Sequence, residues 1–438
     1  MKTKEFHHPS IKIISLGCSK NLVDSEQLAA QLQANDFEVQ WETAQKSDIV
    51  IVNTCGFIDS AKEESINTIL QYAQAKEQGK IRQLIVTGCL SQRYANELRE
   101  EIPEVDAWHG TMDMPQLLNN IGAEYKHQLL GERAYSATPK HYAYLKISEG
   151  CNRTCSFCAI PLMRGKHVSK SIEAIVAEAK NLAKNGVKEI MLIAQELTYY
   201  GLDLYKKRSL DQLLYALQNV DGIEWIRLHY AYPSKFPLEI LNAMKDCDKV
   251  CHYLDLPLQH ANDAVLKRMQ RQITLAETGE LIDKIRTAIP DIALRTTFLV
   301  GFPGETEAEF EDLVQFVQQQ RFERLGVFTY SHEEDTAAYF AEDDVPEEIK
   351  EARKAYLMDI QQQISFEINT QKIGKTFKVL FDRYENNYFI GRTQYDSPEV
   401  DNEVLVPAKA NTYLRIGDFA QIKITDASEF DLIGEVVS

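Results

Sequence analysis

The sequence lacks long hydrophobic runs and contains little glycine, proline or tryptophan. No apolar stretch approaches the roughly 18 residues that a membrane-spanning helix needs. With only 20 Gly and 13 Pro among 438 residues, a collagen-like or linker-dominated chain is excluded. Residues 1–9 contain no apolar core of the kind found in a secretion signal. We therefore expect a cytoplasmic protein that has no membrane partner.

Basic residues are scarce relative to acidic ones. The chain carries 48 Lys and Arg against 65 Asp and Glu, which gives a net charge of −17. Because nucleic-acid-binding proteins usually carry a basic face, this balance favours a basic or neutral partner. Apolar residues make up 44% and charged residues 26%, as is ordinary for a globular protein, and the length predicts about three domains.

The first domain is predicted over residues 1–130. Short apolar runs at 11–16, 48–53 and 83–87 read as strands, and amphipathic stretches near 25–33, 60–76 and 92–101 read as helices. Strand–helix alternation of this kind predicts an open parallel sheet with helices on both faces. Residues 131–141 show no periodicity and are predicted to be a linker.

The alternation resumes over residues 142–371. Six strands are predicted at 142–147, 189–194, 225–229, 253–258, 293–300 and 325–330, which suits a partial (β/α) barrel with its active site at the C-terminal ends of the strands. A long helix follows, with Pro346 suited to its first turn. Residues 372–438 contain short strands at 377–381, 388–392, 403–406 and 419–424, which predict a small all-β barrel.

Three of the eight cysteines form a CxxxCxxC motif directly after the first predicted barrel strand. Cys151, Cys155 and Cys158 can wrap one loop around a cubane iron–sulfur cluster, with one thiolate on each of three irons. The fourth iron is then open for an exogenous ligand, as the open position of a catalytic metal is. A structural zinc site needs a fourth protein ligand, and none stands nearby at ordinary spacing. A buried cysteine cluster or a zinc knuckle is the alternative.

A CxxxCxxC motif after the first strand of a barrel resembles the radical S-adenosylmethionine (SAM) superfamily. The resemblance implies that the amino and carboxylate groups of SAM chelate the open iron. It also implies that an electron from the cluster cleaves SAM to methionine and a deoxyadenosyl radical. The cofactor does this chemistry, and the protein binds, orients and shields it.

Three other cysteines stand at the C-terminal ends of the three predicted strands of the first domain. Cys18, Cys55 and Cys89 are separated by 37 and 34 residues, about one strand–helix unit each. Because the C-terminal ends of parallel strands form a common crevice, these thiols can converge there. The functional interpretation is a second cluster with three protein ligands and one open iron. The alternative is three buried cysteines that only pack.

Two three-cysteine sets on consecutive α/β domains, followed by a small β-barrel, resemble the methylthiotransferase family over nearly the whole chain. The last domain resembles the TRAM domain of that family, which implies a role in substrate recognition. The family implies two 4Fe–4S clusters and two uses of SAM. One SAM methylates a sulfur at the auxiliary cluster, and a second gives the radical that abstracts a substrate hydrogen. The substrate carbon then captures the methylthio group.

The family modifies either an adenosine in transfer RNA or an aspartate of a ribosomal protein, and three features favour the second branch. Residues 15–26 (SLGCSKNLVDSE) and 53–60 (NTCGFIDS) resemble the ribosomal-protein enzymes, whereas the transfer RNA enzymes typically carry Gly-Cys-Gln-Met-Asn at the first site. Residues 330–339 also resemble that branch. Finally, residues 371–438 hold eight basic against eleven acidic residues, a balance that suits a basic protein better than phosphate. The resemblance implies a β-methylthio-aspartate on protein twelve of the small ribosomal subunit.

Five further residues are candidates for contact with SAM or the substrate. Glu196 ends the second barrel strand and can accept hydrogen bonds from SAM, or can lie at the surface. Arg164 can hold a carboxylate of the cofactor or substrate, or can be an ordinary loop arginine. Arg295 stands inside the fifth strand and is expected to face a site or a salt bridge. Gln259 and His260 are predicted to line the cavity mouth, although His260 can equally be structural.

Two more motifs and two rival functions stay open. The segment 301–305 (GFPGE) can present backbone N–H groups to the cofactor or form a tight turn, and Cys247 and Cys251 are assigned a structural role. A transfer RNA methylthiotransferase is the first rival. A non-catalytic iron–sulfur carrier or scaffold is the second, although six barrel units and a β module exceed what a carrier needs. The main hypothesis also requires an external electron donor and a sulfur source.

Overall fold

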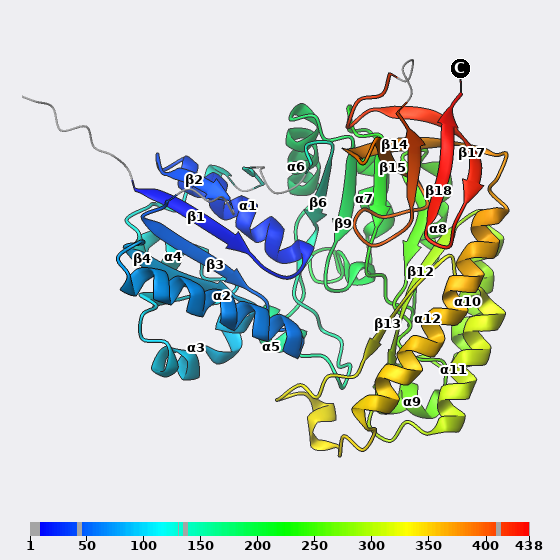
Figure 1. Ribbon diagram of the computed structural model, residues 1–438, viewed down its shortest axis with the longest axis horizontal. Helices are drawn as coiled ribbons and strands as arrows, with labels where there is room; N and C mark the ends of the chain where they lie inside the picture. The colour runs from blue at the N-terminus through cyan, green and yellow to red at the C-terminus, as the bar shows by residue number, and fades with distance from the viewer. Residues whose placement is uncertain (1–8, 42–45, 130, 135–138, 409–412, 438) are drawn as a thin grey trace, which may run out of the picture.

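The computed structural model describes residues 9–41, 46–129, 131–134, 139–408 and 413–437. Three bodies follow one another along the chain: an N-terminal α/β domain, a central open barrel and a C-terminal closed barrel (Figure 1). Within the described residues, none of the helices has the length and apolar character needed to cross a bilayer. The mixed α/β fold with a small β-barrel at the C-terminus confirms the predicted fold class.

The N-terminal domain is a five-stranded parallel sheet in the order β2-β1-β3-β4-β5. Its central strand β3 (Ile49–Thr54) is buried along its whole length, as a parallel strand covered on both faces should be. Helices α1 and α4 pack on one face and helices α2 and α3 on the other. The remaining strands are β1 (Ser10–Ser15), β2 (Glu38–Trp41), β4 (Gln83–Gly88) and β5 (Ala107–Trp108). The helices are α1 (Ser19–Gln33), α2 (Asp59–Glu77), α3 (Cys89–Glu101) and α4 (Met114–Asn120).

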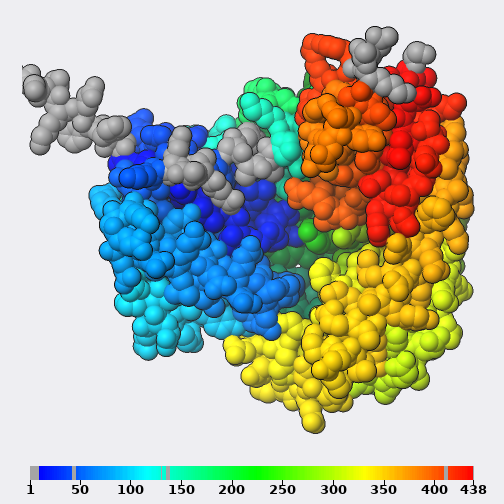
Figure 2. Space-filling model, in the orientation of Figure 1, coloured from blue at the N-terminus to red at the C-terminus, as the bar shows by residue number. Residues whose placement is uncertain are grey.

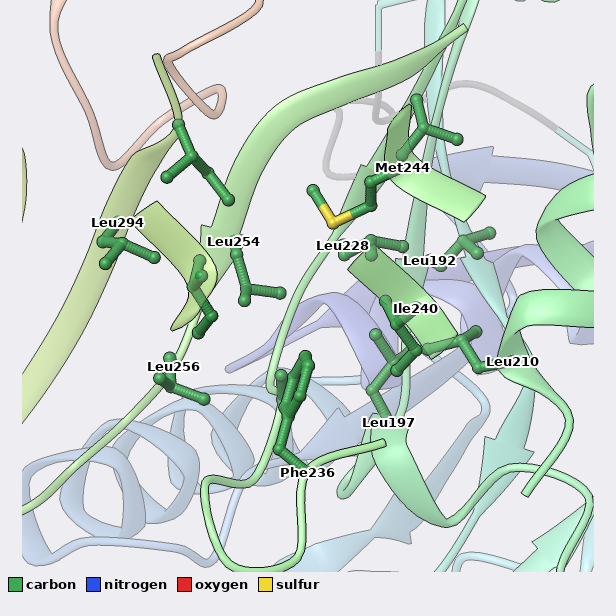
Figure 3. Packing of buried hydrophobic residues seen from close by; sticks show 14 of the residues in the cluster. Leu192, Leu197, Leu210, Leu228, Phe236, Ile240, Met244, Leu254, Leu256 and Leu294 are labelled. Carbon is green, nitrogen blue, oxygen red and sulfur yellow. The ribbon is translucent and has the colours of Figure 1, made fainter. Parts of the chain in front are cut away.

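The central body is an open barrel of six parallel strands in the order β6-β9-β10-β11-β12-β13. Alternate strand residues such as Leu192, Leu228 and Leu254 point outward and pack against helix residues such as Ile240 and Met244 (Figure 3). The strands are β6 (Tyr142–Lys146), β9 (Glu189–Ile193), β10 (Trp225–Leu228), β11 (Val250–Asp255), β12 (Ala293–Val300) and β13 (Arg324–Thr329). The helices are α5 (Ile160–Arg164), α6 (Ile172–Lys184), α7 (Leu210–Leu217), α8 (Glu239–Asp246), α9 (Asp263–Arg268), α10 (Leu275–Ala288) and α11 (Glu307–Gln320).

A long helix, α12 (Glu347–Thr370), packs along α11 and β13 and leads into the C-terminal barrel. That barrel is closed in the order β14-β15-β16-β18-β17 around a small apolar core. Its strands are β14 (Thr376–Glu385), β15 (Tyr388–Thr393), β16 (Glu403–Pro407), β17 (Phe419–Ala427) and β18 (Asp431–Val436). The barrel lies at the N-terminal ends of the central strands (Figure 1).

The segment 393–402, between β15 and β16, enters the central barrel from that end. Its polar side chains meet inward-facing residues of four central strands, and His229 just after β10, through the contacts Arg324–Asp396, His229–Ser397, Tyr142–Glu399, Tyr253–Asp401 and Arg295–Asp401. The C-terminal barrel therefore closes one end of the central barrel. The other end, where the strands terminate, stays toward the N-terminal domain and is called the barrel mouth below.

Several elements differ from the sequence prediction. Strand β11 starts and ends three residues before the predicted 253–258. The predicted end was too late because Leu256 and Leu258 are buried without belonging to the strand. Helix α1 starts six residues earlier than predicted, since the polar residues of its first turn are buried against the barrel. Pro346 stands just before α12 rather than inside it. The short strands β2 and β5 and the last strand β18 were not predicted. Of the proposed linker 131–141, residues 135–138 lie outside the described residues.

Candidate active site

The two parallel sheets direct the C-terminal ends of their strands toward each other (Figure 1). Cys18 caps the N-terminus of α1, Cys55 directly follows β3, and Cys89 is the first residue of α3. These three cysteines, called the N-terminal triad, therefore stand at the edge of the N-terminal sheet that faces the barrel mouth. Cys18 is exposed, and the other two are buried.

A glycine brings the first of these cysteine loops against the second. Gly17 has φ +85°, and a Cβ built on it would lie 2.6 Å from Cys55 Cβ and 2.8 Å from Cys55 Sγ. Only glycine fits this conformation and this contact. Burial, with Cys18 and Cys55 adding to it, raises the pKa of Cys89 to about 11, although Arg164 opposes the rise. The three thiols therefore form one electrostatic group.

Cys151, Cys155 and Cys158, called the barrel triad, lie on the loop that follows β6 and β7 (Ser148–Glu149). The loop is held by backbone hydrogen bonds from Cys151 N to Gly165 O (3.1 Å) and from Cys158 N to Cys155 O (3.2 Å). Burial raises the pKa of Cys151 to about 11 and that of Cys158 to about 12. Backbone hydrogen bonds thus help to fix the position of this loop.

The two triads adjoin. Cys89 packs in one apolar cluster with Ala159, Ile160 and Met163, and Ala159 directly follows Cys158. The Thr111 hydroxyl donates to the carbonyl of Met163 at 2.7 Å, which fastens the same helix α5 to the N-terminal domain. One short helix therefore connects the ligand loop of the barrel triad to the N-terminal triad.

The donor set of each triad fits an iron–sulfur cluster better than a single ion. Within the described part of the chain, no three His, Cys, Asp or Glu side chains lie close enough to hold one metal ion. A four-iron cluster separates its thiolates more widely than a single ion does, because each binds a different iron. Metal binding requires each thiol to lose its proton, and three thiols per triad are the number that a cluster with one open iron takes.

A buried ion pair supports the barrel triad. Arg153, two residues after Cys151, donates to Glu196 Oε2 at 3.1 and 3.2 Å. Its guanidinium lies between the rings of Tyr199 and Tyr232, at 4.0 and 3.8 Å from the ring centroids. Burial raises the pKa of Glu196, although Arg153 opposes the rise. Glu196 is thus neither a surface carboxylate nor free; it anchors the ligand loop.

Arg164 joins the two domains rather than lying free for a carboxylate ligand. It donates to Asp24 Oδ2 at 2.6 Å and to the side-chain oxygen of Asn21, both on α1. The same Asn21 oxygen lies 3.8 Å from Cys89 Sγ. Lys146, at the end of β6, also binds Asp24. Arg164 therefore fixes the position of the N-terminal triad relative to the barrel.

The remaining candidates, Arg295, Gln259 and His260, differ in whether the protein already supplies a partner. Arg295 was expected to face a site or a salt bridge, and it forms salt bridges with Asp255 and Asp401 at 3.3 Å each. Gln259 has φ +76° and follows β11, and no partner of its side chain is recorded among the described residues. His260 Nδ1 accepts from the Asn262 N–H at 3.0 Å, while its Nε2 is buried without a hydrogen-bond partner in the described structure. Burial lowers the pKa of His260 to about 3, so the imidazole is neutral.

The GFPGE segment is a tight turn in this structure. Glu305 Oε2 accepts from the N–H groups of Gly301 and Phe302 at 2.6 and 3.1 Å, so these donors are already used. Cys247 and Cys251 are each 1% exposed and lie in the apolar core, in keeping with the structural role assigned to them.

Besides Arg153, Asn21 and Asp24, sequence reasoning missed residues that lie close to the triads. Arg271 Nη1 lies 3.4 Å and Tyr232 OH 3.6 Å from Cys155 Sγ. Lys20, two residues after Cys18, places its ammonium 3.1 Å from the ring centroid of Tyr230. The one available signal was a charged residue next to a ligand cysteine, which applies to Lys20 but not to the distant Arg271.

Comparison with known families identifies three regions. The sequence matches the Radical SAM superfamily over residues 145–317, the TRAM domain over 373–437 and the uncharacterized protein family UPF0004 over 10–110. The two cysteine triads fall in the UPF0004 and Radical SAM regions, one in each.

Curated relatives match the chain from end to end. A protein of Cytophaga hutchinsonii named ribosomal protein uS12 methylthiotransferase RimO is 57% identical over 438 residues, which are 100% of both chains. A protein of the same name from Flavobacterium johnsoniae is 56% identical and covers 99% of this chain and 100% of its own. The same name belongs to a Bacteroides fragilis protein that is 53% identical over 98% of this chain and 99% of its own.

Solved structures share the fold at low sequence identity. The radical SAM methyltransferase TsrM from Kitasatospora setae, with cobalamin and a [4Fe-4S] cluster, has a TM-score of 0.55 at 14% identity, covering 74% of this chain and 75% of that one. The cobalamin-dependent SAM radical enzyme OxsB has a TM-score of 0.53 at 13% identity, covering 82% of this chain and 56% of that one. These likenesses show the fold alone.

Proposed function

Because the chain belongs to the family of ribosomal protein uS12 methylthiotransferases, we propose that it transfers a methylthio group to the β-carbon of an aspartate in uS12. The chain is a radical SAM enzyme, and that superfamily uses a 4Fe–4S cluster and SAM. The observation that carries the proposal is the contact between the triads, since Cys89 packs on the helix that follows Cys158. A methylthiotransferase needs radical formation and sulfur delivery at one place.

In this proposal the barrel triad holds the cluster that binds SAM. When bound, that cluster supplies the electron that cleaves SAM. Arg153 and Glu196 hold the ligand loop in place, and Arg271 directs a positive charge at Cys155. Of the five candidate contacts, Gln259 and His260 are the proposed neighbours of SAM, because protein partners already occupy the three charged residues. His260 Nε2 makes no hydrogen bond in the described structure, with Glu305 Oε2 3.9 Å away, and is the atom that a ligand would satisfy.

The N-terminal triad would hold a second cluster. Cys18, Cys55 and Cys89 would hold it, and the cluster would supply the site at which sulfur is delivered. Arg164 and Asn21 keep Cys89 beside α5, which would place sulfur delivery and radical formation on the same side of the barrel mouth. An external electron donor and a sulfur source complete the reaction.

The surface has room for a protein segment at this place. Figure 2 shows a hollow between the blue N-terminal domain, the yellow segment near residue 335 and the orange-to-red C-terminal barrel, with green barrel residues at its floor. The net charge of −17 favours a basic ribosomal protein over the phosphates of transfer RNA. A loop of uS12 entering this hollow would reach the barrel mouth.

Mass spectrometry of three substrates offered in parallel tests the proposal. Reconstituted, reduced enzyme with SAM is given purified uS12, assembled small subunits and unmodified transfer RNA. We expect the mass of one methylthio group to appear on an aspartate of uS12, free or assembled, and no gain on the RNA. A gain on the RNA alone would overturn the substrate assignment while keeping the reaction. Deoxyadenosine without any modified substrate would overturn the proposed function itself.

A further inference from the structure

Lys20 is a buried cation with no acidic partner at the junction of the two domains. It is the second residue of α1 and is only 8% exposed. Its ammonium lies 3.1 Å from the ring centroid of Tyr230, and no carboxylate of the described residues lies within 4.0 Å of it. The neighbouring cations Lys146 and Arg164 both have such a partner, Asp24.

The ammonium of a mostly buried side chain keeps only part of its hydration, which is unfavourable when no carboxylate replaces the lost water. A carboxylate partner normally offsets this loss, and a cation–π contact does so only in part. The face of the Tyr230 ring stabilises the charge but leaves the hydrogen-bonding capacity of the ammonium unused. A hydrogen-bond acceptor that binds here would therefore supply contacts that the described residues do not give to the ammonium.

The position of Tyr230 is fixed by its backbone. The residue follows β10 at the barrel mouth with φ +63°, a conformation that is strained for a tyrosine. Its N–H donates to Asp255 Oδ2 at 3.0 Å, and its carbonyl accepts from Leu197 N at 3.1 Å. The ring is thus held in place beneath Lys20 by contacts on both sides of the peptide. Strain retained at such a position is typical of a functional site.

The Lys20 ammonium belongs to the barrel mouth rather than to the outer surface. The next residues of α1, Leu22 and Val23, pack on the inward-facing Tyr144 and Met191. Lys20 is also one of the cations that, after burial, hold the pKa of His229 well below its usual value. His229 follows β10 and is buried in the central barrel. Lys20 thus stands between Cys18 and the interior of the barrel.

We propose that Lys20, supported by the ring of Tyr230, binds the side-chain carboxylate of the substrate aspartate. This inference rests on the proposed function and names the residue that selects its substrate. Binding the carboxylate next to Cys18 would place the adjacent β-carbon near the transferred sulfur. The transfer RNA enzymes typically carry Gly-Cys-Gln-Met-Asn here, which puts a methionine at the place of Lys20. An adenine base carries no negative charge, so an ammonium has no partner in those enzymes.

The test measures the binding of two substrates to wild-type and variant holoenzyme. The substrates are uS12 and uS12 in which the target aspartate is replaced by asparagine. We expect wild-type enzyme to bind the asparagine form roughly 10- to 100-fold more weakly. Lys20→Met should weaken binding of unaltered uS12 by a similar factor and abolish the discrimination between the two forms. Lys20→Arg, which keeps the charge, should restore part of it.

Matched controls separate this role from a general loss of structure. Lys378, on the C-terminal barrel, also lies over an aromatic ring, that of Phe419 at 4.1 Å, but it is paired with Glu224. Lys378→Met should leave both affinities unchanged. Lys20→Met should keep the iron content of the wild type, its affinity for SAM alone and its formation of deoxyadenosine.

Three outcomes would overturn the inference. One is a Lys20→Met enzyme that still distinguishes aspartate from asparagine as the wild type does. Another is a loss of SAM affinity with discrimination intact, which would assign the carboxylate to the cofactor. The third is a wild-type enzyme that neither binds nor modifies uS12. Only this third outcome also removes the proposed function, so the two failures are distinguishable.

Discussion

A different arginine acts on each of the two sets of thiols. Arg164 opposes the rise in the pKa of Cys89, and Arg271 opposes the rise in the pKa of Cys158, in each case against the larger effect of burial. Each triad thus has its own arginine, which would lower the energy of thiolates and of a negatively charged cluster. The triads are adjacent but separately held, so their functions can be separated by substitution.

Alanine substitution of the cysteines should separate radical formation from transfer. Cys151→Ala, Cys155→Ala or Cys158→Ala is expected to abolish deoxyadenosine formation, because the barrel triad would lose a cluster ligand. Cys55→Ala or Cys89→Ala is expected to preserve deoxyadenosine formation and to abolish methylthio transfer. Chromatography of the nucleoside and mass analysis of uS12 measure the two steps. Cys247→Ala serves as the control, since Cys247 lies in the core away from both triads.

Deoxyadenosine formed by a barrel-triad variant would disprove that ligand assignment. Methylthio transfer by an N-terminal-triad variant would show that the second cluster is dispensable.

Cysteine spacing predicted the six candidate ligands, but it could not predict the ion pairs that hold the ligand loops in place. A ligand loop is local in sequence, so three cysteines in eight residues are visible directly. Glu196 and Arg153 are 43 residues apart, and Arg164 and Asp24 are 140 apart. Such pairs depend on tertiary packing, and nothing in either local segment indicates the other member. For that reason the protein partners of Glu196 and Arg164 could not be predicted from the sequence.

At the scale of elements, the segment 393–402 explains how the C-terminal barrel is attached. Asp396 is fully buried and accepts from Arg324 Nε at 3.0 Å and from the Thr393 hydroxyl at 2.6 Å. Arg227 donates to the carbonyl of Gln394 at 2.7 Å. Among the described residues, Arg324 has its carboxylate partner on this segment, whereas Arg227 also pairs with Glu189 and Arg295 also pairs with Asp255 inside the central barrel. Without the segment, Arg324 would be a buried cation with no carboxylate partner.

Removing one carboxylate of this segment should detach the C-terminal barrel. We expect Asp396→Asn to destabilise the interface by about 3–5 kcal/mol, because Arg324 would be left buried with a neutral partner. Asp418→Asn is the matched control, since the Asp418–Lys188 pair joins the same two domains at the surface. Exposed pairs of that kind contribute about 0–1 kcal/mol. Urea unfolding and protease resistance of both variants measure the difference, and equal stability would contradict the role given to the segment.

The strands of both α/β bodies could be predicted because parallel strands are continuous apolar runs. The error at β11 has the same origin, since Leu256 and Leu258 prolong the apolar run beyond the end of the strand. The short edge strands β2 and β5 have four and two residues, too few for a periodic signal. The insertion of segment 393–402 has no local signal at all, because an acidic turn usually faces solvent.

At the scale of the whole molecule, the domains are joined by carboxylates whose charged forms are stabilised. Burial raises the pKa of Asp24, but Lys146 and Arg164 outweigh it and leave that pKa below its usual value. Burial likewise raises the pKa of Asp382, and Arg392 with His141 reverses the shift. Asp396 behaves in the same way through Arg324 and Lys372. One carboxylate on α1 and two on the C-terminal barrel thus hold the central barrel from both sides.

These shifts fix the sign of the pH dependence of domain docking. Each folded pKa lies below the unfolded value of 3.8, so the stabilisation is present above pH 3.8 and is lost as the pH falls through the folded values. We expect the radius of gyration, measured by small-angle X-ray scattering, to stay constant from pH 8 to about pH 4.5 and to increase below about pH 4. The Asp24→Asn variant should be more open throughout, because it lacks one of these charges at every pH. A radius of gyration that does not change as the pH falls below about 4 would contradict the role given to these carboxylates.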